Sequence, residues 1–570
     1  MRALSRQLNA CNKKGVKVQN FKYRVGFLGC QPRPVLPWDK TNIGLLKDLG
    51  FNTIQLNIAW ATRPGGEPLN LEDVLDVPDE HKGEAVMQGD QSPERRKRRK
   101  RELRERIEVC QDAGLRTIFH FGAPYVGDKN IGDAPPNCLR DGKTVNRCVY
   151  LLEEFTKEYP GVDDILIYTY DQHAWLCSEF GPCPRCTGVP LVDRVVPFLE
   201  TMKNTWLKTH PEGRLWWEPW EFSAGQVFKT VDMFEPKGFG YALHCNIAEV
   251  MGSFPGDRWL KNTIALAAER DIPCIVEYWL GGPSEEVEPY MNLSYPLVTL
   301  RGLQTLASIP NVSGIKEYYG LLPDKEDPNL RMTGLFFSNP DIEEKAALET
   351  LAEPYGDAAE EVVKFWHLTS EFMDLFPWET SWTIRAIGNS NPAHSLSAAL
   401  LRGVPWHTPS WTSTRRNTYM IVDTVDNPDP WMLEDIQLRC HASAQKMERA
   451  LEVGDNVLKS IPEELASGFA EGLRELRHMK CRTMAYVYHA RETNIATAMR
   501  ELKRQETSIP NEMWEEMKSL LKDDQANQDQ AEPIASAIEM LESDPDKFLE
   551  NYFELVEDKI SKGYLSMTSR

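Results

Sequence analysis

The sequence predicts an α/β protein in which a (β/α)8 barrel is followed by a mainly α-helical C-terminal domain. Short apolar, β-rich segments alternate with longer helical segments eight times over about 300 residues, which is the pattern of such a barrel. Several helical segments end in a glycine just before the next apolar segment, as in KDLGFN and QDAGLR, and glycine favours a helix C-terminus. No GxGxxG motif follows any apolar segment, which disfavours an open, doubly wound sheet.

The barrel strands are expected at eight apolar segments with strong β propensity. In chain order they are RVGFLG at Arg24, NTIQLNIAW at Asn52, RTIFHFG at Arg116, DILIYTYD at Asp164, RLWWEPWE at Arg214, YALHCNIAE at Tyr241, PCIVEYW at Pro273 and VSGIKEYYG at Val312. The helices between them are expected at 41–50, 95–113, 149–159, 191–208, 225–234, 256–270 and 294–308. These elements place the barrel at 24–340, after an N-terminal extension over 1–23.

The C-terminal domain, 341–570, lacks the alternation of strands and helices. Its helices are expected at 341–376, 430–455, 462–480, 483–504, 511–524 and 533–561. The segment 377–429 is rich in Trp, Pro, Ser and Thr and is expected to be irregular. It either folds over the mouth of the barrel or packs between the two domains.

The charge balance excludes several classes of partner. The chain has 570 residues, with 65 Lys and Arg against 85 Asp and Glu, and therefore a formal net charge of −20. A chain this acidic repels nucleic acid and anionic membranes. No apolar segment is long enough to span a membrane, no signal peptide is apparent, and the 12 cysteines show no disulfide framework. We therefore expect a cytoplasmic protein; the sequence leaves homo-oligomer formation open.

One basic segment stands out against this acidic background. RRKRRKRELRER runs from Arg95 to Arg106, within the helix expected before the third strand. Charged runs on helices are usually solvated, so we interpret it as an exposed helix face, with an anion-binding patch as the alternative.

Carboxylates follow several of the expected strands, where this fold keeps its catalytic groups. Asp171 follows the fourth strand, Glu218 ends the fifth, Glu277 ends the seventh and Glu317 ends the eighth. A carboxylate at the end of an apolar strand is costly to bury unless it is paired or used. Two carboxylates across one site are what glycoside hydrolysis requires. These four residues are therefore the candidate catalytic groups.

Aromatic and histidine side chains gather at the same strand ends. Seven of the 16 tryptophans fall at or just after an expected strand end, and sugar rings stack on such aromatic faces. A single Trp is more often a core residue, and a single His on a strand is often only hydrogen-bonded. The candidate substrate-binding residues are Trp60, His120, His173, Trp175, Trp217, Trp220, His244, Asn246, Trp279 and Tyr319.

These features resemble the TIM-barrel glycoside hydrolase superfamily in its clan-A-like arrangement. The resemblance covers roughly 24–320 and rests on the strand order, the second-strand segment KDLGFNTIQLNIAW and the carboxylates after strands four and seven. It implies that Asp171 is the acid/base and Glu277 the nucleophile. Strand four of that superfamily usually ends in Asn-Glu, whereas this chain reads YTYDQHAW. Glu218 or Glu317 is therefore the alternative for one of the two catalytic roles, acid/base or nucleophile.

The sequence thus predicts an exo-acting glycoside hydrolase whose substrates are small neutral oligosaccharides or glycosides. It is expected to need no cofactor for catalysis. Two alternatives remain. A metal-dependent sugar isomerase or epimerase would hold a divalent ion with carboxylates and histidine from the strand ends. A non-catalytic carbohydrate-binding barrel would bind sugars on the aromatic surface without cleaving them.

A cluster of cysteines follows the fourth strand. LCSEFGPCPRCTG contains Cys177, Cys183 and Cys186, and the last two form a C-x-x-C pair, the spacing of zinc knuckles. Cys138 and Cys148, from the preceding connection, could supply further ligands. The sequence favours free thiols here, with a structural Zn²⁺ site or a disulfide as the alternatives.

Overall fold

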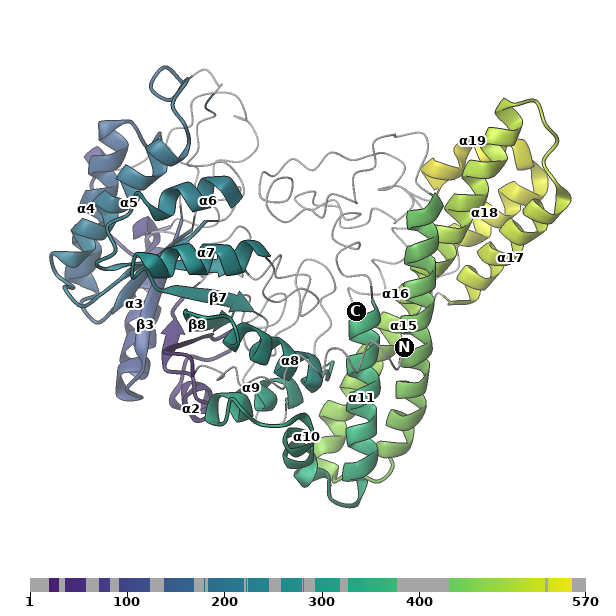
Figure 1. Ribbon diagram of the computed structural model, residues 1–570, viewed down its shortest axis with the longest axis horizontal. Helices are drawn as coiled ribbons and strands as arrows, with labels where there is room; N and C mark the ends of the chain where they lie inside the picture. The colour runs from purple at the N-terminus through teal and green to yellow at the C-terminus, as the bar shows by residue number, and fades with distance from the viewer. Residues whose placement is uncertain are drawn as a thin grey trace.

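The computed structural model describes 20–29, 36–57, 71–81, 92–122, 138–168, 179, 183–219, 222, 224–244, 258–278, 280, 293–317, 327–376, 430–527 and 532–555. All eight expected strands are present, and they form a closed barrel of parallel strands in chain order. Figure 1 shows this α/β part of the molecule beside the long C-terminal helices. The fold class predicted from the sequence is confirmed. The strands are β1 (Tyr23–Phe27), β2 (Thr53–Gln55), β3 (Arg116–Phe121), β4 (Asp164–Tyr168), β5 (Leu215–Glu218), β6 (Phe239–His244), β7 (Cys274–Tyr278) and β8 (Val312–Glu317).

Helices surround the barrel and connect its strands. They are α2 (Lys40–Asp48), α3 (Pro93–Asp112), α4 (Gly142–Glu158), α5 (Val192–Leu207), α6 (Ala224–Val231), α7 (Arg258–Glu269), α8 (Pro296–Ala307) and α9 (Pro328–Ser338). Two short 3₁₀ helices, η1 (Leu71–Asp73) and η2 (Asp79–His81), precede α3. Gly50 and Gly114, after α2 and α3, have φ of 96° and 72°, a left-handed conformation that favours glycine. Helix α4 begins earlier than expected, because the Asp141 side chain caps it by accepting from the Lys143 amide at 3.0 Å.

Alternate side chains of the strands fill the inside of the barrel. Tyr23 packs against an interior apolar cluster of Val25, Ile118, Leu166, Trp216, Ala242 and Ile275. The intervening side chains, such as Ile167 and Val276, belong to a much larger cluster that includes the surrounding helices. Because successive residues point to opposite faces, the residues two positions beyond the interior cluster also face the barrel axis, nearer the C-terminal ends of the strands.

The C-terminal region is helical throughout the part that the structure describes. Its elements are α10 (Glu344–Ala352), η5 (Glu353–Ala358), α11 (Ala359–Leu375), α15 (Pro430–Val457), α16 (Glu463–Arg504), α17 (Asn511–Asn527), α18 (Glu532–Ser543) and α19 (Pro545–Leu555). The single helix expected at 341–376 is divided, because Pro354 and Gly356, whose φ is 57°, interrupt it. The two helices expected at 462–480 and 483–504 are one continuous helix, α16. The helix expected at 533–561 divides before Pro545, where Asp544 caps α19 through the Lys547 amide at 3.1 Å.

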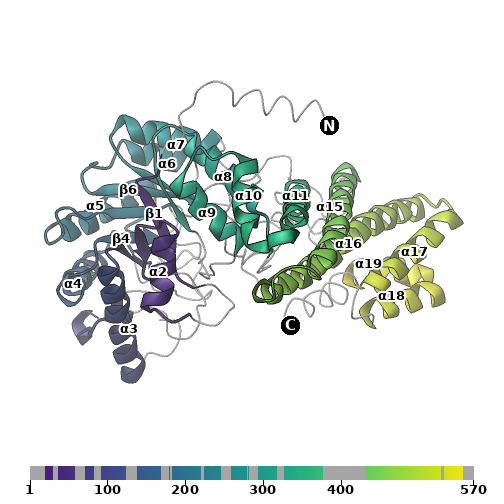
Figure 2. The same ribbon diagram turned by 90° about the horizontal axis from the view of Figure 1, so that it is seen from below.

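Helix α16 joins two apolar cores. Helices α11, α15 and α16 run side by side next to the barrel (Figures 1 and 2), and their apolar residues continue the cluster of the barrel helices. The C-terminal end of α16 instead packs with α17, α18 and α19 around a separate cluster that includes Met499, Leu521 and Phe548. None of the helices in the described ranges is long and apolar enough to cross a membrane.

Candidate active site

A layer of ionisable side chains lies directly above the apolar interior of the barrel, at the C-terminal ends of the strands. His120, Glu218 and Glu277 each follow an interior apolar residue by two positions, on β3, β5 and β7. Lys316 occupies the corresponding position on β8, because it is the register partner of Glu277. All four are at most 1% exposed. Because burial of ionisable groups is costly, this layer marks a place where charge is compensated or used. We call these four residues the mouth layer.

Glu277 and Lys316 form a buried ion pair. The Nζ of Lys316 donates to Oε1 of Glu277 at 2.5 Å. Burial by itself lowers the pKa of Lys316, but the charges of Glu277, Glu218 and Glu317 outweigh burial and raise this pKa above its ordinary value. Lys316 is therefore a firmly held ammonium that pairs with Glu277.

His120 and Glu218 form the other half of the mouth layer. Nε2 of His120 lies 3.8 Å from Oε2 of Glu218, and both side chains are fully buried. Asn57 holds the backbone of β3 in place here: its Oδ1 accepts from the His120 amide at 2.9 Å and its Nδ2 donates to the His120 carbonyl at 2.6 Å. On the other side of the ring, Nε2 of Gln55 lies 3.4 Å from Nδ1, and the Tyr168 ring meets the imidazole edge-on at 5.8 Å. These contacts fix the orientation of the imidazole beside Glu218.

Glu317, the last residue of β8, has a different environment. Its Oε2 accepts from the backbone amide of Leu280 at 2.9 Å, which ties the end of β8 to the chain after β7. Glu317 follows Lys316 and so has the opposite parity to the mouth layer. Its carboxylate still contributes to the raised pKa of Lys316. Lys316 therefore pairs with Glu277, and the charges of Glu218 and Glu317 also act on it.

Several candidate residues lie outside the part of the chain that the structure describes. These are Asp171, Trp60, His173, Trp175, Trp220, Asn246, Trp279, Tyr319 and Cys177. His244 is the last residue of β6, where it pairs in register with Glu277. Its backbone thus ends in the same region as the mouth layer.

One predicted sugar-binding tryptophan, Trp217, requires a correction. Trp217 is fully buried on the outside of β5, where its ring packs against Phe222, Phe234 and Tyr241, so it is a core residue and not a sugar-stacking one. Its neighbour Trp216 points the other way, into the interior apolar cluster. Both are buried because β5 is covered on both faces, as parallel strands of this fold are.

Sequence reasoning misses Lys316, Gln55 and Tyr168. A signal for Lys316 exists: it is a lysine inside the apolar strand VSGIKE. A buried lysine is rare unless it has a partner, and only the register of β7 and β8 supplies that partner. Gln55 and Tyr168 resemble ordinary strand residues in sequence, so nothing local distinguishes them.

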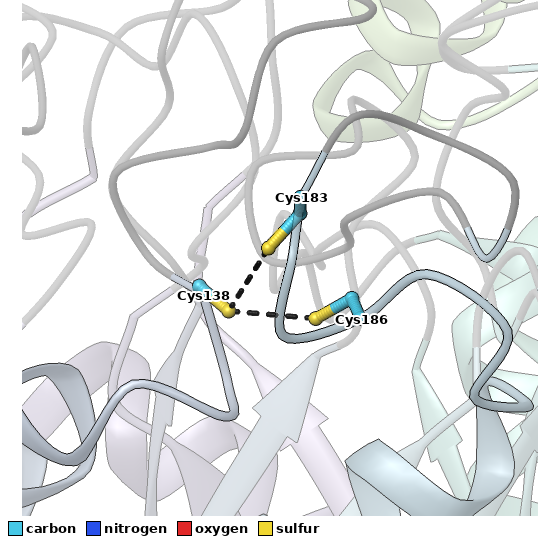
Figure 3. Close-up of side chains that lie close together, drawn as sticks. All are labelled: Cys138, Cys183 and Cys186. Carbon is cyan, nitrogen blue, oxygen red and sulfur yellow. Dashed lines mark hydrogen bonds between the residues drawn. The ribbon is translucent and has the colours of Figure 1, made fainter.

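Three cysteines meet beside this end of the barrel. Cys138 precedes α4, and Cys183 and Cys186 precede α5. Their sulfur atoms are turned toward one another (Figure 3), at 3.8 Å from Cys138 to Cys183 and 3.4 Å from Cys138 to Cys186. Cys148, the other residue considered as a ligand, is a free cysteine outside this group.

The basic segment of α3 is held mainly by acidic partners. Arg99 is buried beside Asp73, with 3.4 Å between Nη1 and Oδ1. Arg106 donates to the Leu56 carbonyl at 2.7 Å and covers the ring of Trp38, with 4.6 Å to the ring centroid. Further cations of the segment pair with carboxylates, as in Arg98–Glu102, Arg101–Glu105 and Lys100–Glu158. The segment thus combines exposed pairs with buried structural arginines.

Comparison with known proteins identifies the fold. No family model matches the chain, and no curated protein matches it by sequence. A solved structure of a GH138 enzyme targeting pectin rhamnogalacturonan II is similar, with a TM-score of 0.62 and 11% identity over 99% of this chain and 69% of that one. A GH5-4 broad specificity endoglucanase from an uncultured bacterium matches with a TM-score of 0.38 and 11% identity, over 55% of this chain and 94% of that one. A family 5 glycoside hydrolase from Prevotella bryantii matches with a TM-score of 0.36 and 10% identity, over 57% and 98%. The first likeness spans nearly the whole chain, and it shows that this chain shares the fold of a glycoside hydrolase.

Proposed function

We propose that the protein is a glycoside hydrolase whose reacting carboxylates belong to the mouth layer. The observation that carries the proposal is the buried ion pair of Glu277 and Lys316 at the C-terminal ends of β7 and β8. Catalytic groups of this fold occupy that end of the barrel. The fold shared with the GH138 enzyme supports the same reaction class.

In this proposal Glu277 is the nucleophile, and the ammonium of Lys316 pairs with its carboxylate. The carboxylate attacks the anomeric carbon while a carboxylic acid gives its proton to the leaving oxygen, so one C–O bond forms as the other breaks. Water then attacks the glycosyl-enzyme ester and returns a proton to the same acid, which releases the sugar. The stereochemistry at the anomeric carbon is therefore retained.

The general acid is Asp171 or Glu218. The resemblance of the sequence to clan-A-like barrels implies Asp171. Glu218 is the alternative, because its Oε2 lies near the imidazole of His120 within the mouth layer. A general acid needs a carboxyl group that stays protonated at neutral pH, and burial favours that form.

The proposed substrates are small, neutral oligosaccharides or glycosides cleaved from one end. The net charge of −20 supports this choice, since an acidic protein repels polyanionic polymers. The GH138 enzyme targets a pectic polysaccharide, so a substrate panel includes oligosaccharides from rhamnogalacturonan II beside simple nitrophenyl glycosides.

Lys316 also bears on the alternative of a metal-dependent isomerase. Its ammonium contacts Glu277 and interacts with Glu218 and Glu317, so it already supplies the positive charge that a divalent cation would bring to these carboxylates. This arrangement favours hydrolysis by carboxylates over metal-assisted isomerisation at the same place.

The proposal is tested by screening the panel with the wild-type protein and with Glu277→Gln. The control is Glu344→Gln, which removes a carboxylate that pairs with Arg301 on the outside of the barrel. We expect hydrolysis by the wild type and the control, and a loss of about 10³-fold or more in Glu277→Gln. Equal hydrolysis by all three proteins would overturn the assignment of Glu277. Binding of a sugar without turnover would favour the carbohydrate-binding alternative.

A further inference from the structure

The three clustered cysteines have the spacing of metal ligands. A Zn–S bond is about 2.3 Å long, so two sulfurs of a tetrahedral site lie about 3.8 Å apart. The sulfurs of Cys138 and Cys183 are 3.8 Å apart, those of Cys138 and Cys186 are 3.4 Å apart, and all three lie within 4.8 Å of one another. A disulfide requires about 2.05 Å and would use only two of the three. The geometry therefore fits three thiolates around one ion.

The backbone arranges two of these thiols as a knuckle. Cys183 and Cys186 are separated by Pro184 and Arg185, and the Cys186 amide donates to the Cys183 carbonyl at 3.1 Å. Thr187 closes the turn, since both its amide at 3.0 Å and its hydroxyl at 2.8 Å donate to the same carbonyl. This tight turn brings both sulfurs to one side, opposite Cys138.

Polar contacts hold the two chain segments together around the thiols. Arg185 forms an ion pair with Asp141 at 2.9 Å, and Arg140 donates to the Arg185 carbonyl. Asp141 also caps α4, and its amide donates to the Cys138 carbonyl at 2.9 Å. These contacts hold the segment before α4 against the segment before α5.

We propose that the thiolates of Cys138, Cys183 and Cys186 bind one Zn²⁺, which fastens the β3–α4 connection to the β4–α5 connection. Each of the three side chains is 1% exposed, as in a closed structural site. Structural zinc takes four ligands, so a fourth donor completes the tetrahedron. In sequence the same β4–α5 connection carries Asp171.

The experiment measures metal in the full-length protein after reconstitution with Zn²⁺ and removal of free ion. We expect about one Zn²⁺ per chain by mass spectrometry of the metal, and sulfur-to-metal charge-transfer absorption when Co²⁺ replaces it. Cys138→Ser and the double variant Cys183→Ser/Cys186→Ser are expected to lose both signals. Cys148→Ser, which changes a cysteine of α4 outside the group, is the matched control and is expected to keep them.

Each outcome of this experiment decides the proposal. Wild-type protein that retains no Zn²⁺ and gives no charge-transfer band with Co²⁺ would overturn it, and this result does not depend on the folding of any variant. Full metal content in Cys138→Ser would also overturn it. Alkylation under denaturing conditions that leaves two of the three cysteines unmodified would indicate a disulfide instead. None of these measurements uses hydrolytic activity, so the outcome is independent of the proposed function.

Discussion

Replacement of Lys316 by methionine removes the ammonium that pairs with Glu277 at the C-terminal end of the barrel. In the Lys316→Met variant, Glu277 stays buried but loses its partner. Breaking a buried ion pair by removing one member costs about 3–5 kcal/mol, because the remaining charge stays desolvated. At about 2–4 °C per kcal/mol, the thermal midpoint of Lys316→Met is expected to fall by roughly 6–20 °C. Differential scanning calorimetry measures this change.

The same substitution is expected to move the pH dependence of hydrolysis. A neighbouring positive charge favours the ionised form of a carboxylate, and the Lys316 ammonium supplies that charge to Glu277. Without it, the acid limb of the kcat/KM profile is expected to shift by about one to three pH units toward higher pH. The matched control is Lys203→Met, since Lys203 is also buried and pairs with Glu200 at 2.8 Å, but on α5. This control is expected to lose stability without any shift of the profile.

A double variant separates the two effects. Lys316→Met/Glu277→Gln removes both charges, so it is expected to regain much of the stability that Lys316→Met loses. The reasoning would be refuted if Lys316→Met kept the wild-type midpoint and the wild-type acid limb. It would also be refuted if Lys203→Met shifted the acid limb of the kcat/KM profile as far as Lys316→Met does.

Three further predictions concern other parts of the molecule. Trp217→Ala is expected to lower stability by about 3–5 kcal/mol through the cavity it leaves, with KM unchanged, and a raised KM with normal stability would instead place this ring in the sugar site. Burial raises the pKa of Glu492 to about 8 from 4.5, so its contribution to the stability of α16–α19 is complete below pH 4.5 and is lost as the pH rises through about 8. Glu492→Gln is expected to weaken this decline in thermal midpoints measured from pH 5 to 9, and an unchanged decline would contradict it. Chelator treatment of the wild type is expected to lower the midpoint, while the Cys183→Ser variant is expected to be insensitive to chelator.

The strands of the barrel could be located from the sequence because they are apolar segments, several of which follow a helix that ends in glycine. Gly50 and Gly114 have the left-handed conformations that such helix ends require. The helical boundaries were less accessible. No helix-breaking residue lies between 480 and 483, so the predicted division of α16 into two helices was wrong. Pro354 and Pro545, in contrast, lie where helices are interrupted, and both could be recognised in the sequence.

The candidate site could be predicted from the sequence only in part, because it depends on which face of each strand packs against which neighbour. Trp216 and Trp217 are adjacent in the sequence and enter different cores, which a strand-end position alone does not distinguish. The partner of Lys316 is apparent only from the strand register, which places it next to Glu277. Cys138 is 45 residues from Cys183, and the barrel brings them together by placing the two connections side by side.

The most direct test of the central claim is chemical rescue of Glu277→Ala with azide, on an aryl glycoside that the wild type hydrolyses. If Glu277 is the nucleophile, the variant loses about 10³-fold or more of its activity, and azide restores release of the aryl group with formation of a glycosyl azide. Hydrolysis by Glu277→Ala at the wild-type rate, with no glycosyl azide formed, would contradict the claim that this carboxylate of the mouth layer performs the reaction.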